Sequence, residues 1–225
     1  MNKVHEMFPL VVYQGTIDCH EQFKKDNLDS LRDYWFNGYK NESPECSGRI
    51  FLHEKKECKS LFDSLKDNID QYMTHLNIDH TLFKYHVAKS WVGAHKDDST
   101  PSVVPHFHNS SDLSFVYYLK TDSTSDKFCV DQISNSNEFM DCLFETAKET
   151  NTLLGYNRYN CNVYTITPTE GTVLIFPSNV RHHTQKFTER KDERIIIAGD
   201  VRVTLTSKHF KYHQGTTHPS QWLEL

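Results

Sequence analysis

Apolar residues change their spacing once along this chain, close to Thr81. Before that point they recur at every third or fourth position, which is the period of a helix with one buried face. The spacing predicts a helix that ends at about Phe36 and a second helix over 61–76, with a short strand over 8–17 before them. Polar and turn-forming residues fill 37–57, so we expect a loop between the two helices.

The start of the first helix carries a local signal. Asp18 and Glu21 stand three residues apart, which is the spacing of a capping box. The apolar side of this helix is then Phe23, Leu28, Leu31 and Trp35, and that of the second helix is Leu61, Leu65, Ile69, Tyr72 and Leu76.

After Thr81 the chain is typical of β structure. Apolar, β-branched and aromatic runs bounded by turn residues predict strands; they cover 81–93, 103–109, 113–120, 162–167, 172–177, 181–188 and 194–205. Between the third and fourth of these lies an insert, 121–161, with a helix from about Asn137 to Leu154. Helices first and many strands afterwards predict a mainly β fold with flanking helices. A double-sheet jelly roll suits this number of strands.

The domain organisation follows from the absence of repeats and long linkers. We expect one domain over 1–225, a length that can bury a sizeable core. Within it, 1–80 supplies the first strand and supporting helices, 81–206 the β core, and 207–225 a C-terminal tail.

Composition narrows the functional classes. Hydrophobic residues make up 37% and the mean hydropathy is −0.65, so no segment has the apolar length of a membrane span. The first residues, MNKVHEMFPLVVYQG, lack the pattern of a secretory signal. The net charge of −5 argues against a general nucleic-acid binder. Six irregularly spaced cysteines without a CxxC pair indicate free thiols, so we expect a cytoplasmic protein.

Candidate chemistry gathers in PHFHNSSDLSFVYYL, residues 105–119. His106 and His108 would share one face of a strand, because residues two apart point the same way. With 14 histidines in the chain, about one such pair arises by chance, so its context carries the signal. In the strand that follows, Ser114 and Tyr118 fall on one face, which indicates a lined cavity.

A third histidine follows the apolar strand GTVLIFP. It is His182 or His183, and strand alternation by itself does not choose between them. Neutral imidazoles from neighbouring strands are suitable ligands for iron with open coordination positions. Arg194 then opens the strand Ile195–Ile197, and its planar guanidinium could hold a carboxylate. Its competitors are Arg190, Lys191 and Arg202.

These residues resemble a known family, the 2-oxoglutarate and Fe(II)-dependent dioxygenases. The chain is similar to the small 2OG-Fe(II) oxygenases of bacteria and phages that are related to prolyl hydroxylases. The similarity rests on MFPLVVY, PHFHNSSDLSFVYYL, TPTEGTVLIFPSNVRHH and Arg194 with its strand, about half of the chain. It implies a double-stranded β-helix, or cupin-like jelly roll, that uses Fe(II), 2-oxoglutarate and O₂.

The resemblance also assigns the site. His106 would be the proximal ligand, and the FPS-x-x-x-His pattern places the distal ligand at His182. Arg194 would bind the distal carboxylate of 2-oxoglutarate, with Ser114 and Tyr118 at the family's positions for a hydroxyl and a tyrosine on that carboxylate. No catalytic residue beyond the metal ligands is implied.

One position departs from the family pattern. Most such enzymes carry Asp or Glu two residues after the first histidine, where this chain has His108. Three arrangements follow: His108 ligates and completes a three-histidine site, water fills the position, or Asp112 turns in from the next strand.

The implied activity is hydroxylation of an unactivated C–H bond, coupled to conversion of 2-oxoglutarate to succinate and CO₂. By resemblance the first expectation for the substrate is a protein or peptide side chain, and we expect the insert to cover the metal mouth and select it. One alternative is a three-histidine, cupin-type dioxygenase without 2-oxoglutarate, which would have no use for Arg194. Another is a jelly-roll binding module without a metal, because fold does not determine function.

Overall fold

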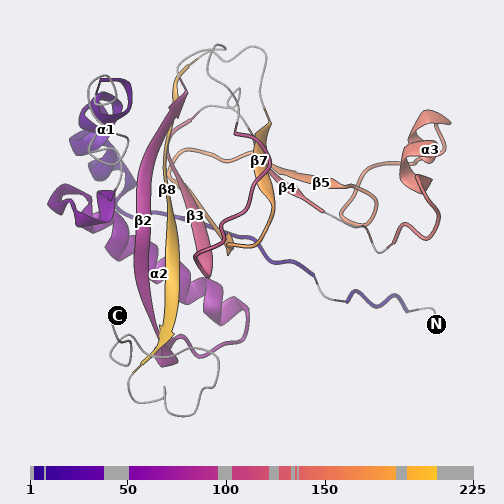
Figure 1. Cartoon of the computed structure of the whole chain (residues 1–225), viewed down its shortest axis with the longest axis horizontal. Helices are drawn as coiled ribbons and strands as arrows, with labels where there is room; N and C mark the ends of the chain where they lie inside the picture. The colour runs from indigo at the N-terminus through magenta and orange to yellow at the C-terminus, as the bar shows by residue number, and fades with distance from the viewer. Residues whose placement is uncertain are drawn as a thin grey trace, which may run out of the picture.

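The computed structural model describes residues 3–7, 9–37, 51–95, 103–121, 127–132, 135, 137–185 and 192–206. Within these residues the strands form two antiparallel sheets, with helices against the larger one (Figure 1). The larger sheet has the order β1 (Tyr13–Thr16), β6 (Thr172–Pro177), β3 (Leu113–Lys120), β8 (Arg194–Leu205), β2 (Phe83–His95). The smaller sheet has the order β5 (Val163–Ile166), β4 (Lys127–Asp131), β7 (His182–Gln185).

Apolar side chains from both sheets meet between them. Phe128 of β4 packs against Phe176 of β6, with ring centroids 5.1 Å apart, and Val116 of β3 and Ile196 of β8 belong to the same cluster. The predicted mainly β, jelly-roll architecture with flanking helices is therefore confirmed.

The two N-terminal helices cover the other face of the larger sheet (Figure 1). They are α1 (His20–Phe36) and α2 (Lys59–His75), close to the predicted ranges. Phe23 and Leu31 of α1 pack with Tyr117 and other sheet residues in the main core, because the helical period places them on one side. Among the described residues, no helix has both the length and the apolar character that a bilayer crossing requires.

The predicted capping box at Asp18 is wrong. The helix begins at His20 with Cys19 as its N-cap, and no side chain caps it. Backbone contacts hold this end instead, since the Phe23 N–H donates to the Cys19 carbonyl at 2.8 Å. Asp18 and Glu21 therefore lie one residue out of the required frame.

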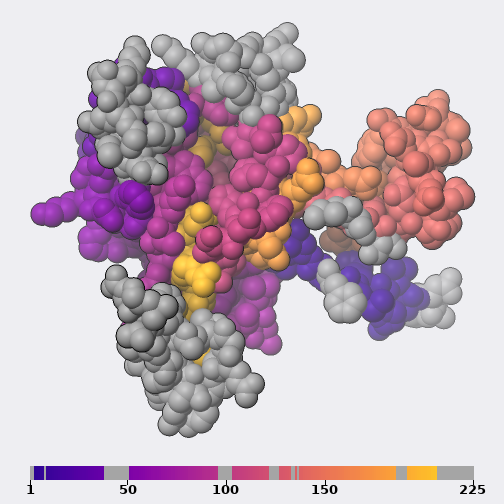
Figure 2. All heavy atoms as spheres, viewed as in Figure 1, coloured from indigo at the N-terminus to yellow at the C-terminus, as the bar shows by residue number. Residues whose placement is uncertain are grey.

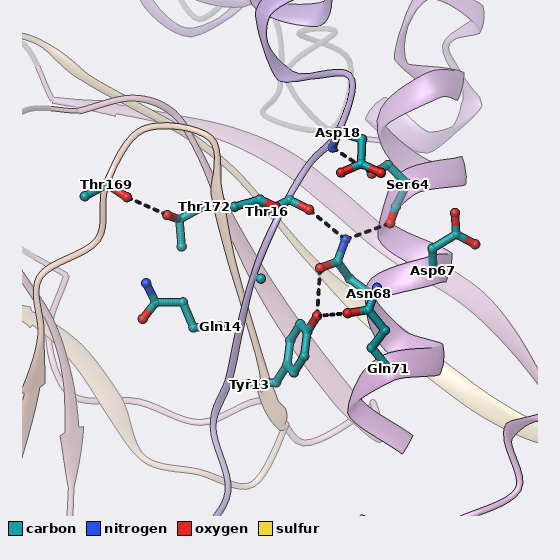
Figure 3. Close-up of a pocket in the computed structure, with 11 residues that line it drawn as sticks. Tyr13, Gln14, Thr16, Asp18, Ser64, Asp67, Asn68, Gln71, Thr169 and Thr172 are labelled. Carbon is teal, nitrogen blue, oxygen red and sulfur yellow. Dashed lines mark hydrogen bonds between the residues drawn. The ribbon is translucent and has the colours of Figure 1, made fainter. Parts of the chain in front are cut away.

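Hydrogen bonds join β1 to α2 beside a cleft of about 420 Å³ (Figure 3). The buried amide of Asn68 donates to the Thr16 carbonyl at 3.0 Å and to the Ser64 carbonyl at 2.9 Å. The Tyr13 hydroxyl lies 3.1 Å from the Asn68 side-chain oxygen. A Cβ at Gly15 would clash with that oxygen and with the Tyr13 ring, so a larger residue there would force these side chains to shift.

Two predicted elements need correction. Residues 103–109 do not form a strand, since among them only His106 makes a β-bridge, to His182. Conversely, β4 lies inside the segment 121–161 that we expected to be an insert, and its Phe128 and Val130 are buried in the core. A strand of five residues between polar segments is too short for an alternating apolar pattern to be recognised, so the sequence does not predict β4.

What remains of the insert projects from the body. Its helix, α3 (Leu143–Glu149), is shorter than predicted and buries none of its residues. Figures 1 and 2 show this segment standing out to one side of the sheets. Arg158 there donates to the Glu6 carboxylate at 2.7 and 2.6 Å, which ties the N-terminal segment to it.

Candidate metal centre

Three histidines meet where β7 faces the segment before β3. The backbones of His106 and His182 exchange two hydrogen bonds, at 3.0 and 2.9 Å. The His108 N–H donates to the Ser178 carbonyl at 2.8 Å. As a result one nitrogen from each of the three imidazoles lies within 4.8 Å of the other two.

The second nitrogen of each ring determines which atom is free for a metal. His106 Nδ1 lies 2.9 Å from the Val104 carbonyl, and His182 Nδ1 lies 2.9 Å from the Val180 carbonyl. His108 Nδ1 lies 2.6 Å from Oδ1 of Asp200. Carbonyl and carboxylate oxygens only accept, so all three Nδ1 atoms carry the proton. With this proton on Nδ1, the Nε2 atom of each ring is the one left for a metal, and three imidazole nitrogens form a donor set that fits Fe(II).

His182 is the most enclosed of the three. Its ring stacks on Phe128 at 5.5 Å and meets the edge of Phe176 at 4.8 Å. This burial lowers the pKa of His182 to about 4; the hydrogen bond to Val180 opposes the shift, and a proton on His106 or His108 would add to it. The ring is therefore neutral at pH 7, with its lone pair available.

The neighbouring histidine has another partner. His183 Nδ1 lies 3.1 Å from Oδ1 of Asp131, and His183 is outside the three-histidine group. The other candidate for the third position, Asp112, is also occupied elsewhere. Its carboxylate accepts the Val203 N–H at 2.7 Å and lies 3.5 Å from Nε of Arg202.

Arg194 reaches the same cavity from its far end. The cavity has a volume of about 240 Å³ and is lined by all three histidines and by Arg194. Arg194 is only 4% exposed, and its guanidinium lies over the ring of Tyr118 at 5.3 Å. Within the described part of the chain its Nε has no hydrogen-bond partner. A buried guanidinium with an unpaired Nε is suited to bind an anion that is not part of the chain.

The other arginine candidates do not share this setting. Arg202 pairs with Asp112 and donates to the Ser110 carbonyl at 3.2 Å, on a more exposed part of β8. Arg190 and Lys191 lie outside the described residues.

Ser114 lies at the histidine end of the cavity and not at the arginine end. Its hydroxyl donates to Oδ1 of Asp200 at 2.9 Å and lies 2.9 Å from the Ser178 hydroxyl. Ser114 is paired with Asp200 in the β3–β8 register, and Asp200 lies six positions after Arg194 along β8. At the usual rise of a strand this is about 20 Å, so Ser114 and Arg194 are not neighbours.

Asp200 is the site residue that the sequence reading missed. Burial alone would raise the pKa of this carboxyl, but the hydrogen bond and charge of His108, with Ser114 and Lys89, hold it below its usual range. A signal existed, because Asp200 directly follows the apolar run 195–199, and an acidic residue in such a strand rarely stays buried without a partner.

Comparisons with known proteins bear on this site. Residues 89–200, about half of the chain, match the family model described as "Putative 2OG-Fe(II) oxygenase". This segment contains the three histidines, Ser114, Tyr118 and Arg194. No curated protein matches the chain significantly.

Solved structures of similar fold share little sequence with this chain. A non-heme monooxygenase, ThoJ, in its nickel complex, has a TM-score of 0.57 at 10% identity, covering 87% of this chain and 75% of that one. A Pseudomonas putida prolyl-4-hydroxylase has a TM-score of 0.51 at 10% identity, covering 86% and 88%. An oxidoreductase of the 2OG-Fe(II) oxygenase family from Burkholderia pseudomallei has a TM-score of 0.43 at 13% identity.

For the Burkholderia protein, 65% of this chain aligns with 56% of that one, so the similarity spans only about half of its length. At 10% identity the first two structures show the fold alone, and the family match indicates the chemistry. The chain belongs to the 2OG-Fe(II) oxygenases, oxidoreductases that use Fe(II), 2-oxoglutarate and O₂.

Proposed function

We propose that the chain is a 2-oxoglutarate-dependent hydroxylase whose Fe(II) is held by His106, His108 and His182. Arg194 binds the distal carboxylate of 2-oxoglutarate in this proposal. The observation that supports it is one cavity with three convergent imidazoles at one end and a buried guanidinium at the other. The two alternatives, a dioxygenase without 2-oxoglutarate and a binding module without a metal, leave Arg194 unexplained.

The histidines hold the metal with orientations fixed in advance. Each ring is anchored through Nδ1, so no rotation is needed when Nε2 binds. Three protein ligands leave open coordination positions for the co-substrate and O₂. When bound, Fe(II) with 2-oxoglutarate supplies the oxidative chemistry, in which the co-substrate is decarboxylated to succinate and CO₂.

Arg194 positions the co-substrate. Its planar fork can give two hydrogen bonds to one carboxylate, and its burial strengthens them. Tyr118 supports the guanidinium through its ring face. We assign Ser114 to the Asp200 contact instead of the 2-oxoglutarate carboxylate, because its hydroxyl is already used there.

Aromatic side chains shield the cavity from water. The ring of Trp91 stacks on His108 at 5.9 Å with an interplanar angle of 15°, and Phe128 and Phe176 enclose His182. Exclusion of water protects a reactive site from side reactions.

The substrate proposal is less specific. A protein or peptide side chain is our expectation, and the similarity in fold to a prolyl-4-hydroxylase is its support. We assign substrate selection to the projecting segment around α3 and not to the whole of 121–161, because β4 belongs to the core. A cytoplasmic location stays a prediction.

One experiment tests the central proposal. Purified protein with Fe(II) and 2-oxoglutarate should form succinate slowly in air, even without a substrate, and the His106→Ala variant should form none. His80→Ala is the matched control, because His80 lies outside the cluster and pairs with Asp70. Succinate formation that survives in His106→Ala would refute the assigned metal site.

A further inference from the structure

Asp200 contacts the one site histidine whose ring is not held by a backbone carbonyl. Its Oδ1 lies 2.6 Å from His108 Nδ1 and accepts the Ser114 hydroxyl at 2.9 Å. The Asp200 side chain is 16% exposed and that of His108 is 14% exposed. Because a carboxylate only accepts, the His108 proton stays on Nδ1 and Nε2 is left facing the other two histidines.

Ser178 extends this contact into a network. Ser114 gives its single proton to Asp200, so the Ser178 hydroxyl, 2.9 Å away, must donate to Ser114. The Ser178 carbonyl also accepts the His108 backbone N–H at 2.8 Å. His108 is therefore held at its main chain and at its ring by one connected set of residues from β3, β6 with its following turn, and β8.

We propose that Asp200 is the carboxylate of this metal centre and acts through His108 as a positioning residue. The inference rests on the proposed function, since it requires that the three histidines hold the metal. Metal-binding histidines that donate their other N–H to a carboxylate are oriented by it and become more basic ligands.

The proposal explains the departure at position 108. An imidazole there, in place of a carboxylate, leaves the metal with one negative charge fewer in its immediate shell. Asp200 supplies a negative charge behind the His108 ring instead of next to the metal. Among the three rings, His108 alone contacts a carboxylate through Nδ1. His106 and His182 need no such partner, because neutral carbonyls already set their protons.

The chain contains a matched control for this contact. Asp131 lies 3.1 Å from Nδ1 of His183, in a carboxylate–imidazole pair of similar burial that is outside the three-histidine group. Asp200→Asn and Asp131→Asn therefore each remove one negative charge beside an imidazole, but only Asp200 is hydrogen-bonded to its histidine, and Asp131 also lies 3.4 Å from Nε of Arg181. Asn keeps the size of Asp and can still accept through its oxygen, so both variants preserve the local packing.

The experiment titrates Co(II) into metal-free protein without O₂ or 2-oxoglutarate, and records the dissociation constant and the visible spectrum of the bound ion. Asp200→Asn should weaken Co(II) binding about 10–100-fold and shift the spectrum. Asp131→Asn should leave both unchanged. The double variant His108→Ala/Asp200→Asn should bind no more weakly than His108→Ala, because Asp200 acts only through that ring.

A second pair of variants keeps the test decisive if Asp200→Asn folds poorly. His108→Asp alone sets two carboxylates side by side, whereas His108→Asp/Asp200→Asn restores a single carboxylate. The double variant should bind Co(II) about as tightly as His108→Asp, because neither variant has an imidazole at position 108 for Asp200 to position.

Three results would overturn the inference. Unchanged Co(II) binding in Asp200→Asn, with binding lost in His106→Ala, removes the role of Asp200 and leaves the metal site intact. A double variant weaker than His108→Ala shows that Asp200 acts on the metal without His108. Wild-type protein that takes up no Co(II) refutes the proposed metal site itself, and the role of Asp200 with it.

Discussion

His106 and His182 face each other across a single β-bridge, with both backbone hydrogen bonds formed and ring centroids 4.3 Å apart. The bridge joins the segment before β3 to the start of β7, which are distant in the sequence. The same pairing that continues the fold thus brings two imidazoles together, so the metal site depends on correct strand register.

The two adjacent histidines of β7 should differ sharply in their effect on metal binding. His182→Ala removes an Nε2 from the cluster and should abolish Fe(II) binding, whereas His183→Ala removes a ring that contacts Asp131 and should leave it nearly unchanged. Anaerobic Fe(II) titration measures both. Equal losses in the two variants would contradict the assignment of His182.

Arg194→Ala should weaken 2-oxoglutarate binding while sparing the metal. Loss of a charge-assisted partner for the distal carboxylate should cost about 2–4 kcal/mol, or about 30- to 1,000-fold in affinity. Arg194→Lys should recover only part of it, because the planar fork is lost. Calorimetric titration of the Mn(II)-loaded protein measures the affinity, with Arg202→Ala as the control. Wild-type affinity in Arg194→Ala would refute the role.

The third ligand position can be decided with two variants. If His108 ligates, His108→Ala should weaken Fe(II) binding more than about tenfold. Asp112→Ala should have no effect, because that carboxylate is bound to the Val203 backbone. Unchanged Fe(II) binding in His108→Ala would favour water as the third ligand. Weaker Fe(II) binding in Asp112→Ala would favour the Asp112 carboxylate.

The contact between β1 and α2 should be sensitive to a single methyl group. Gly15→Ala forces a Cβ against the hydrogen-bonded amide of Asn68 and should destabilise the protein by about 1–3 kcal/mol. Gly155→Ala is the control, since nothing lies within 4 Å of a Cβ there. Urea denaturation compares the two, and equal stabilities would show that the Asn68 contact adapts freely.

Glu193 should make part of the stability depend on pH. The Arg32 hydrogen bond, followed by Lys120, lowers the pKa of Glu193 below its usual range, outweighing its burial. A carboxyl with a lowered folded pKa stabilises the fold above its unfolded pKa of about 4.3, and this contribution is lost as the pH falls through the folded value. Glu193→Gln should therefore be less stable than wild type at pH 6, and the difference should shrink towards pH 3. A difference in unfolding free energy that stays constant with pH would contradict this.

The sequence alone was enough to predict both N-terminal helices and most strands, because helical and strand periods are local properties of the chain. It was also enough to single out His106, His108 and Arg194, since two histidines before an apolar strand and an arginine opening another are visible in order and spacing. Three local predictions were nevertheless wrong: the cap at Asp18, the strand over 103–109, and the insert over 121–161, which contains the core strand β4.

Only the tertiary structure determined which side chains meet. Alternation along the strand left His182 and His183 equal, and only the family pattern favoured His182; in the structure the register between β7 and the segment of His106 places His182 in the cluster and His183 outside it. Asp200 reaches His108 and Ser114 because β8 pairs with β3 at that position, and the short β4 completes the core beside His182. These contacts join residues far apart in the chain, so no local pattern of apolar and polar residues contains them.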